Sequence, residues 1–252
     1  MHHLILLIYL LAGGVLAGIL SSAASFASLV SYPLLLSIGI PPVYANVTND
    51  AALIWNSIGA VFASRRELHG HWHDVGRYAI CTVAGSAIGC WLLLVFPGKT
   101  FERVAPFFIL LAGIMIIISG HHQPQPQLHR PFWQRLIYLI LLTLVGMYAG
   151  YFGAAAGIVV LVLLTYLMEE NFLVVNAVKN TICGLANLTA LIIYTFNSHI
   201  YWHFAIPMAI GMFIGGYLGP VIVRYIPARI VRIIIACLAL TQAAIYFCQA
   251  YL

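Results

Sequence analysis

Long apolar runs separated by short polar stretches extend along the whole chain. Eight predominantly apolar runs cover residues 4–40, 45–63, 78–96, 104–119, 132–168, 174–196, 202–223 and 230–250. Most of them are close to the roughly 20 residues that a helix needs to cross the hydrocarbon core of a bilayer. The pattern predicts an all-α integral membrane protein whose solvent is lipid.

A polar break divides the runs into two groups of four. The stretch from His121 to Arg130 contains Pro124, Pro126 and three glutamines. This composition cannot hold a helix in lipid, because proline lacks a backbone donor and glutamine is costly to bury. We expect residues 1–120 and 132–252 to form two transmembrane repeats, joined by a polar linker at residues 121–131.

The two halves share polar and glycine positions. Ala17-Gly18 recurs as Ala149-Gly150, Asn49 and Asn56 recur as Asn180 and Asn187, Trp72-His73 recurs as Trp202-His203, and Gly85 with Gly89 recurs as Gly215 with Gly219. The two asparagines are seven residues apart in each half, which is about two helical turns and places both on one helix face. Chance similarity between two apolar sequences explains matching leucines but not these positions. We infer an internal duplication.

The first run of each half is too long for a single upright helix. Residues 4–40 and 132–168 would reach well beyond the bilayer at about 1.5 Å per residue. We expect each to be a broken or hairpin element, which gives 8 to 10 membrane segments in total. Small residues mark the candidate breaks: Gly18, Ser22 and Ser25 in the first run, and Gly150, Gly153 and Gly157 in the second. Non-helical backbone at this depth needs surrounding protein or a cavity, so both breaks are candidate solute sites.

Composition narrows the possible functions. A soluble domain carries roughly a quarter charged residues, whereas this chain is 63% apolar and 7% charged. Its formal charge of +5 comes without a basic stripe of interleaved aromatics, so nucleic-acid binding is not predicted. The five cysteines show no paired spacing, and the alternate histidines at 69, 71 and 73 lie in one loop. No metal or cofactor site is predicted.

The distribution of arginine predicts the orientation of the halves. Arginines gather near residues 65, 130 and 224, between the apolar runs. All three stretches face the cytoplasm if each long element returns to the side from which it entered. We therefore favour inverted repeats with both termini outside.

Asp50 is the most informative single residue. A carboxylate at the middle of a bilayer costs on the order of 3 kcal/mol on insertion scales, so Asp50 should face a cavity or a partner. Its polar neighbours in the same run are Asn46, Asn49 and Asn56. The alternative is that Asp50 lies at the outer end of its segment, near the headgroups.

Lys179 occupies nearly the matching place in the second half. Asn180, Thr181 and Asn187 accompany it. Opposite charges at nearly equivalent positions of two packed repeats are able to pair, with an amide-lined site between them, and a lysine ammonium suits an oxyanion. The alternative is that the Lys179 side chain reaches out to the membrane interface.

A longer motif resembles a known family. The first long run ends in Tyr32-Pro33-Leu34-Leu35-Leu36, followed by Gly39, Pro41 and a polar helix entry from Ala45 to Asp50, and the pattern repeats after the linker. It resembles the TauE/SafE family of sulfite and organosulfonate exporters over essentially the whole chain. The resemblance places the family's glycine-rich motif on Ala17, Gly18, residues 22–28, Gly150, Gly153 and Gly157, and its helix entry on residues 46–50 and 179–181.

The resemblance implies a multi-pass secondary transporter of the bacterial inner membrane that handles small sulfur-containing anions, such as sulfite, sulfonates or related carboxylates. We expect an anion to bind between the repeats and to cross by alternating access, with Asp50 available to couple protons. The expected partners are this anion and the lipid bilayer, and the apolar helices are also compatible with a homo-oligomer. The alternatives are an intramembrane enzyme or membrane-complex subunit, or a passive channel. Asp50 has no second carboxylate to act with, so an enzyme is not expected.

Overall fold

The fold is a bundle of helices contributed by both halves of the chain. The computed structural model describes residues 2–95, 132–151, 153, 156–168 and 170–227, together with some residues between 229 and 248. Over these residues it contains helices and turns but no strand. The all-α prediction is confirmed there. The predicted run 104–119, most of 230–250 and the linker at 121–131 lie outside the described residues.

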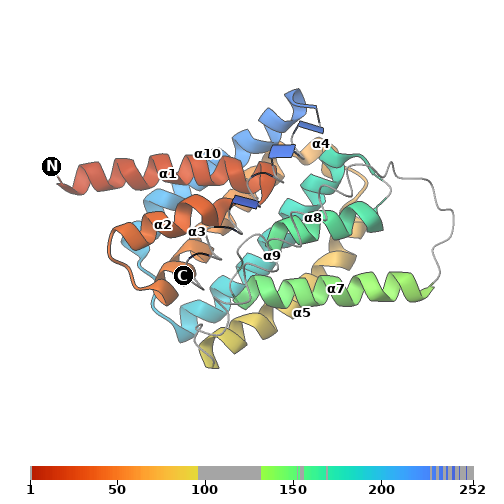
Figure 1. The fold of residues 1–252 in the computed structure, drawn as a ribbon, viewed down its shortest axis with the longest axis horizontal. Coiled ribbons are helices and arrows are strands. Elements are labelled where there is room, and N and C mark those ends of the chain that lie inside the picture. Colours follow the sequence, from red (N-terminus) through yellow and green to blue (C-terminus); the bar gives the residue numbers. More distant parts are fainter. Residues whose placement is uncertain are drawn as a thin grey trace.

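The described helices follow the predicted runs (Figure 1). In the first half they are α1 (His2–Ala24), α2 (Ala27–Ser37), α3 (Pro42–Ala63), α4 (Arg65–Leu68) and α5 (Trp72–Val95). In the second half they are α7 (Phe132–Tyr151), α8 (Ala156–Leu167), α9 (Phe172–Asn197) and α10 (Trp202–Tyr225). Five of these, α1, α5, α7, α9 and α10, are long and apolar enough to cross a membrane. Helix α3 is of similar length but carries several buried polar residues.

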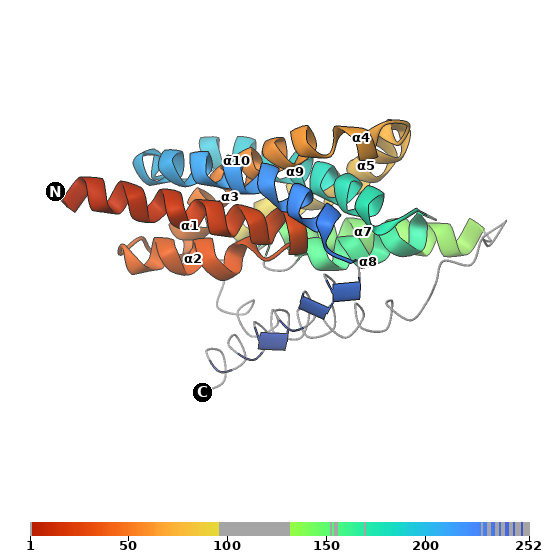
Figure 2. The same cartoon turned by 90° about the horizontal axis from the view of Figure 1, so that it is seen from above.

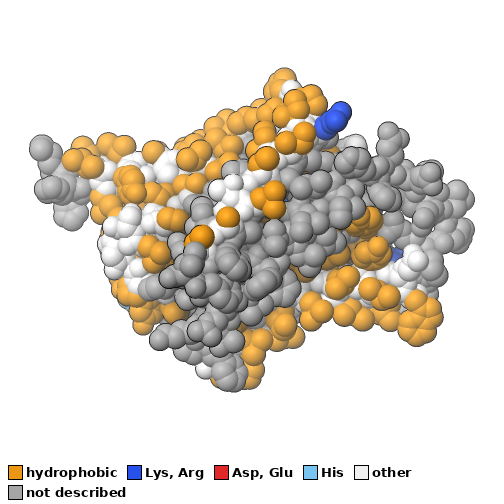
Figure 3. Space-filling model, in the orientation of Figure 1, with side chains coloured by type: hydrophobic (Ala, Val, Ile, Leu, Met, Phe, Trp, Pro, Cys, Tyr) orange, Lys and Arg blue, Asp and Glu red, His pale blue; other side chains and the backbone are white. Residues whose placement is uncertain are grey.

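The outer surface of the bundle is apolar. Large hydrophobic side chains such as Ile80, Trp133 and Phe196 are exposed on different helices. Hydrophobic side chains also cover most of the described surface seen in Figure 3. Such a surface is stable in lipid but not in water, since contiguous apolar patches of this extent are rare on soluble monomers.

Each long run is broken into a full helix and a half helix. Helix α1 ends at Ala24 and the 11-residue helix α2 begins at Ala27, and the 12-residue helix α8 follows α7 in the same way. At about 1.5 Å per residue, α2 and α8 cover roughly half of the hydrocarbon core. Each half helix packs beside the helix that precedes it, as Figures 1 and 2 show.

The breaks lie at Ser25 and Gly153. These residues have positive φ angles of 65° and 73°, and the Ser25 N–H ends α1 by donating to the Ser21 carbonyl oxygen at 2.7 Å. The other residues suggested for the breaks, Gly18, Ser22, Gly150 and Gly157, lie inside helices. Gly18 and Gly150 serve helix packing instead, because their small size lets backbones approach closely. Gly157 lies against the Ser25 side chain, and the Ser22 hydroxyl donates to the Gly18 carbonyl oxygen at 2.9 Å.

The halves pack against each other through two similar helix pairs. Helix α1 packs on α10, and α5 packs on α7. In each pair, two glycines four residues apart on one helix meet two on the other: Gly14 and Gly18 with Gly211 and Gly215, and Gly85 and Gly89 with Gly146 and Gly150. A Cβ atom at Gly18 would lie 2.7 Å from the Met212 carbonyl oxygen, and one at Gly146 would lie 2.5 Å from the Thr82 carbonyl oxygen. Backbone therefore meets backbone at both contacts.

Candidate functional site

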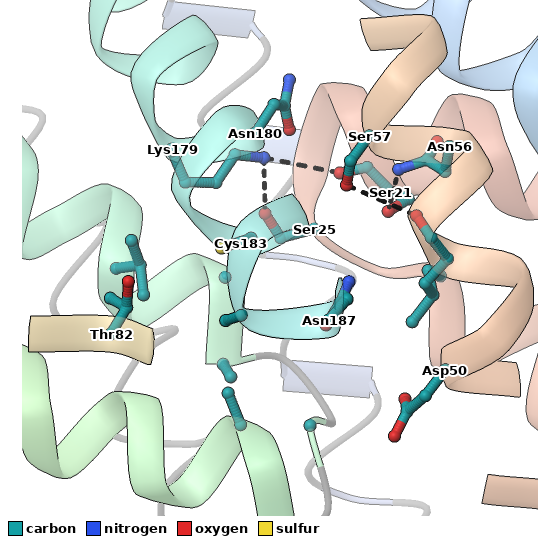
Figure 4. Close-up of a pocket in the computed structure, with 18 of the residues that line it drawn as sticks. Ser21, Ser25, Asp50, Asn56, Ser57, Thr82, Lys179, Asn180, Cys183 and Asn187 are labelled. Atoms are coloured by element: carbon teal, nitrogen blue, oxygen red, sulfur yellow. Dashed lines mark hydrogen bonds between the residues drawn. The ribbon is translucent and has the colours of Figure 1, made fainter. Parts of the chain in front are cut away.

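A cavity of about 70 Å³ with both polar and apolar walls lies between the two halves. Its walls come from α1, α2, α3 and α5 of the first half and from α7, α8 and α9 of the second. The polar residues that line it are Ser21, Ser25, Ser28, Asp50, Asn56, Ser57, Thr82, Lys179, Asn180 and Asn187 (Figure 4). This volume accommodates a few water molecules or one solute of a few heavy atoms.

Lys179 is a buried side chain on the cavity wall. Its side chain is 1% exposed, so it does not reach the membrane interface. The ammonium donates to Ser25 Oγ at 2.8 Å and to the Ser21 carbonyl oxygen at 3.5 Å. Among the described residues no carboxylate lies within 4.0 Å of Nζ, so Lys179 and Asp50 do not form an ion pair. Burial of a charge without an opposite charge nearby is costly, which makes Lys179 a candidate for a role in solute binding.

Side chains of α9 also cap the broken helix α1. The Asn176 and Asn180 amides both donate to the Ser22 carbonyl oxygen, each at 3.0 Å. The last carbonyls of a helix have no partner within the helix, and no water is available in lipid to supply one. These amides therefore stabilise the end of α1 beside the cavity.

Two half helices point their amino ends at the cavity. Ala27 and Ser28 of the first turn of α2 line it, as do Ala156 and Gly157 of the first turn of α8. Phe26, which precedes α2, provides no side-chain cap. Helix amino ends carry positive partial charge and free N–H groups. Together with Lys179, they make this part of the cavity favourable for an anion.

Asp50 lies on the cavity wall, apart from Lys179 (Figure 4). Its side chain is buried inside the protein, so the carboxyl group is enclosed by other residues. Within the described part of the chain, its carboxyl group makes no hydrogen bond or ion pair. The neighbouring Asn56 donates from Nδ2 to Ser21 Oγ at 2.8 Å, while its Oδ1 has no partner. Unpaired acceptors thus lie on the first-half wall.

A family model described as Sulfite exporter TauE/SafE matches residues 10–246, nearly the whole chain. The chain belongs to the TauE/SafE family. The match includes both half helices and every residue of the cavity wall. It confirms the family that the sequence motifs suggest.

Curated relatives of this TauE/SafE protein are named as transporters. The chain is 25% identical over 244 residues to the Sinorhizobium "Probable membrane transporter protein ORF9", covering 95% of this chain and 90% of the relative. It is 25% identical over 247 residues to a Haemophilus influenzae "Probable membrane transporter protein", covering 96% and 95%. It is 24% identical over 234 residues to YfcA of Escherichia coli, covering 91% and 85%. No solved structure gives a significant match. These findings support a multi-pass membrane transporter.

The cavity of the TauE/SafE chain gathers only some of the predicted site residues. Those that line it are Asp50, Asn56, Lys179, Asn180 and Asn187, with Ser25, Gly153 and Gly157 from the breaks. Asn46, Asn49 and Thr181 are buried but do not line it, and the Thr181 hydroxyl donates to its own helix at Ala177. Ser57 and Thr82 also line the cavity, although the sequence pattern did not predict them. Ser57 lies seven residues after Asp50, on the same helix face, which was an available signal.

The halves also contact each other near both ends of α3. At the α4 end, Arg224 of α10 donates to Glu67 of α4 through Nε at 2.7 Å and through a second nitrogen at 2.8 Å, and also to the Ala63 carbonyl oxygen. At the other end, the Tyr201 ring contacts the Tyr44 ring at 6.1 Å. We call these contacts the charged seal and the aromatic seal.

The charged seal predicts a dependence of stability on pH. The hydrogen bond from Arg224 holds the pKa of the Glu67 carboxyl below its usual value of 4.5. Its contribution to the free energy of unfolding is therefore complete above about pH 4.5 and is lost as the pH falls through the lower folded-state pKa. We expect Glu67→Gln to lower the melting temperature in detergent at pH 7 and to reduce its fall on acidification. The effect should be about 1 kcal/mol or less, because the pair is partly exposed.

A charge exchange provides the matched control for this pair. Glu67→Arg combined with Arg224→Glu should recover part of the lost melting temperature, since the opposite charges still meet. Recovery should be incomplete, because the contact from Arg224 to Ala63 is removed. An equal loss in the double variant and in the two single variants added together would contradict a direct interaction.

Proposed function

We propose that the protein is a secondary transporter that carries a small anion, such as sulfite, a sulfonate or a related carboxylate, through the cavity between its halves. The observation that carries the proposal is Lys179, whose buried ammonium lines the cavity and has no counter-ion among the described residues. An oxyanion supplies the missing negative charge. The amino ends of α2 and α8 add positive potential from both halves, as half helices do in other secondary transporters.

The remaining polar side chains fit the oxygens of such a solute. Asn187 and Ser57 line the cavity on walls from different halves. The Asn187 amide offers a donor, and the Ser57 hydroxyl makes only a long hydrogen bond of 3.4 Å to the Leu53 carbonyl oxygen, from which it can turn to the solute. Asp50 gives the same cavity a group that can take up a proton with the anion, as carboxyls inside membrane segments do in proton-coupled transporters. Loading a proton would limit the repulsion between the carboxyl group and the solute.

The arrangement of the loops supports inverted repeats. The loop after α3 holds Glu67, and the loop that follows α9, its equivalent in the second half, holds Tyr201. Glu67 meets Arg224 near the last residue of α3, whereas Tyr201 meets Tyr44 near the first turn of α3. Equivalent loops at opposite ends of one helix are what a repeat turned upside down requires. Opening one seal while the other stays closed would give alternating access.

Counterflow in proteoliposomes tests the proposed function. Purified protein is reconstituted with internal unlabelled anion, and entry of radiolabelled sulfite or ethanesulfonate is followed, with protein-free vesicles as the control. We expect saturable uptake that increases with internal anion, because a carrier returns faster when loaded. Flux that rises without saturation would indicate a channel. A folded protein that moves neither anion would contradict this substrate class.

Side-specific labelling tests the orientation. Single cysteines at Arg66 and Arg229, in a background without the native cysteines, are exposed to an impermeant thiol reagent. We expect both to react from the same side of the membrane, since the Arg224–Glu67 contact places these two stretches at one end. Reaction from opposite sides would contradict the inverted arrangement.

A further inference from the structure

Both helix breaks contain a residue with a positive φ angle, but the residue differs between them. Gly153 has a φ of 73° and Ser25 has a φ of 65°. Among the described residues, Ser25 is the one residue other than glycine with a positive φ. Glycine enters this region without steric cost, whereas the Cβ atom of serine crowds the backbone. Strain of this kind persists mainly at functional positions, so the serine side chain calls for an explanation of its own.

The Ser25 side chain is held in one place on the cavity wall. Its Oγ accepts from Lys179 Nζ at 2.8 Å. On another side it meets Gly157 of α8, where a Cβ atom would lie 2.7 Å from Ser25 Oγ and 2.8 Å from Ser25 Cβ. Glycine at position 157 thus leaves just enough room for this serine. The hydroxyl is fixed between the cation and the amino end of a half helix.

The Ser25 hydroxyl still has a hydrogen to donate. A hydroxyl group has one donor and two acceptor lone pairs. The bond from Lys179 uses a lone pair, and no described group accepts a hydrogen bond from Ser25 Oγ. Two donors, the Lys179 ammonium and the Ser25 hydroxyl, therefore lie 2.8 Å apart on one wall. They fit two oxygens bound to a single central atom.

We propose that Ser25 is a solute-binding residue that selects oxyanions over monatomic anions. This role of Ser25 rests on the proposed function. It defines the solute more closely, as an anion with at least two oxygens on one sulfur or carbon atom. One oxygen takes the charge of Lys179 and the second accepts from Ser25. A halide fills only one of these places, so it gains little from Ser25.

Two substitutions at Ser25 separate the hydroxyl from the backbone. Ser25→Ala removes the hydroxyl and keeps the strained conformation, whereas Ser25→Gly removes both. We expect both variants to raise the half-saturating concentration of sulfite and of ethanesulfonate in counterflow by about tenfold to a hundredfold, the range for a hydrogen bond to a charged group. Ser25→Gly should melt at the same or a higher temperature than the native protein. Ser31→Ala is the matched control, because this buried hydroxyl donates to its own helix and lies off the cavity wall.

Competition by chloride distinguishes direct binding from an indirect effect. If Ser25 only positioned Lys179, its loss would weaken every anion alike. We expect the inhibition constant of chloride against labelled ethanesulfonate to change less than twofold in Ser25→Gly. An equal loss for chloride and the oxyanions, or native half-saturation in Ser25→Gly, would overturn the role of Ser25 alone. Absence of counterflow by the native protein would overturn the proposed function, and this role with it.

Discussion

Lys179→Gln should abolish most anion transport while leaving the protein folded and at least as stable as before. Glutamine keeps an uncharged hydrogen-bond donor, on a side chain one bond shorter, and removes the charge. Loss of a hydrogen bond to a charged solute corresponds to about 1.5 to 3 kcal/mol, or roughly ten- to a hundredfold in half-saturating concentration. Stability should hold or rise, because a buried charge without a counter-ion is removed. Counterflow and the melting temperature, measured on one preparation, check both parts.

Arg135→Gln is the control for this substitution. It removes a positive charge from the exposed first turns of α7, away from the cavity wall, and should leave counterflow unchanged. Lys179→Gln with native half-saturation would contradict a role for the ammonium in binding. A Lys179→Gln protein that melts at a much lower temperature would instead assign Lys179 to holding the end of α1.

Gly89→Ala should lower the free energy of unfolding strongly, although it adds only one methyl group. A Cβ atom at Gly89 would collide with the Met147 carbonyl group and would lie 2.8 Å from the Tyr151 backbone nitrogen. Backbone cannot rotate away as a side chain does, so α5 and α7 must separate. We expect a loss of about 1 to 3 kcal/mol, the range for overpacking, and a lower melting temperature in detergent.

Gly76→Ala provides the control on the same helix. Nothing lies within 4 Å of a Cβ atom at this exposed glycine of α5. Alanine favours the helix there, so the melting temperature should hold or rise slightly. Gly215→Ala, at the equivalent contact between α10 and α1, should reproduce the loss seen at Gly89. Similar melting temperatures for Gly89→Ala and Gly76→Ala would show that the helix pair does not depend on close backbone contact.

The length of the long apolar runs predicts that their helices break, but the residues within the runs do not predict where. A run of residues 4–40 cannot cross a bilayer once, so a break was required. Its place was not evident, because Gly18 looks at least as able to break a helix as Ser25. The difference comes from tertiary packing: Gly18 lies against the α10 backbone, whereas Ser25 meets Lys179.

The polar faces of α3 and α9 were predictable, but the roles of their residues were not. The seven-residue spacing from Asn49 to Asn56, and from Asn180 to Asn187, predicted one polar helix face in each half. Asn56, Asn180 and Asn187 line the cavity, whereas Asn49 does not. The opposite charges of Asp50 and Lys179 suggested a pair. In the structure, the Lys179 ammonium instead donates to the Ser21 carbonyl oxygen near the end of α1 and to Ser25 Oγ. Only the contact between α1 and α9, two helices far apart in the sequence, decides this.

The thiol of Cys183 can report directly whether an anion binds in the cavity between the halves. This thiol lines the cavity, one turn from Lys179. With the other four cysteines replaced, its rate of alkylation is measured with and without saturating ethanesulfonate, which does not react with thiols or with the reagent. If the anion binds in the cavity between the halves, ethanesulfonate should slow the reaction severalfold, and much less in Lys179→Gln. An unchanged rate, in protein that still transports ethanesulfonate, would place the anion elsewhere.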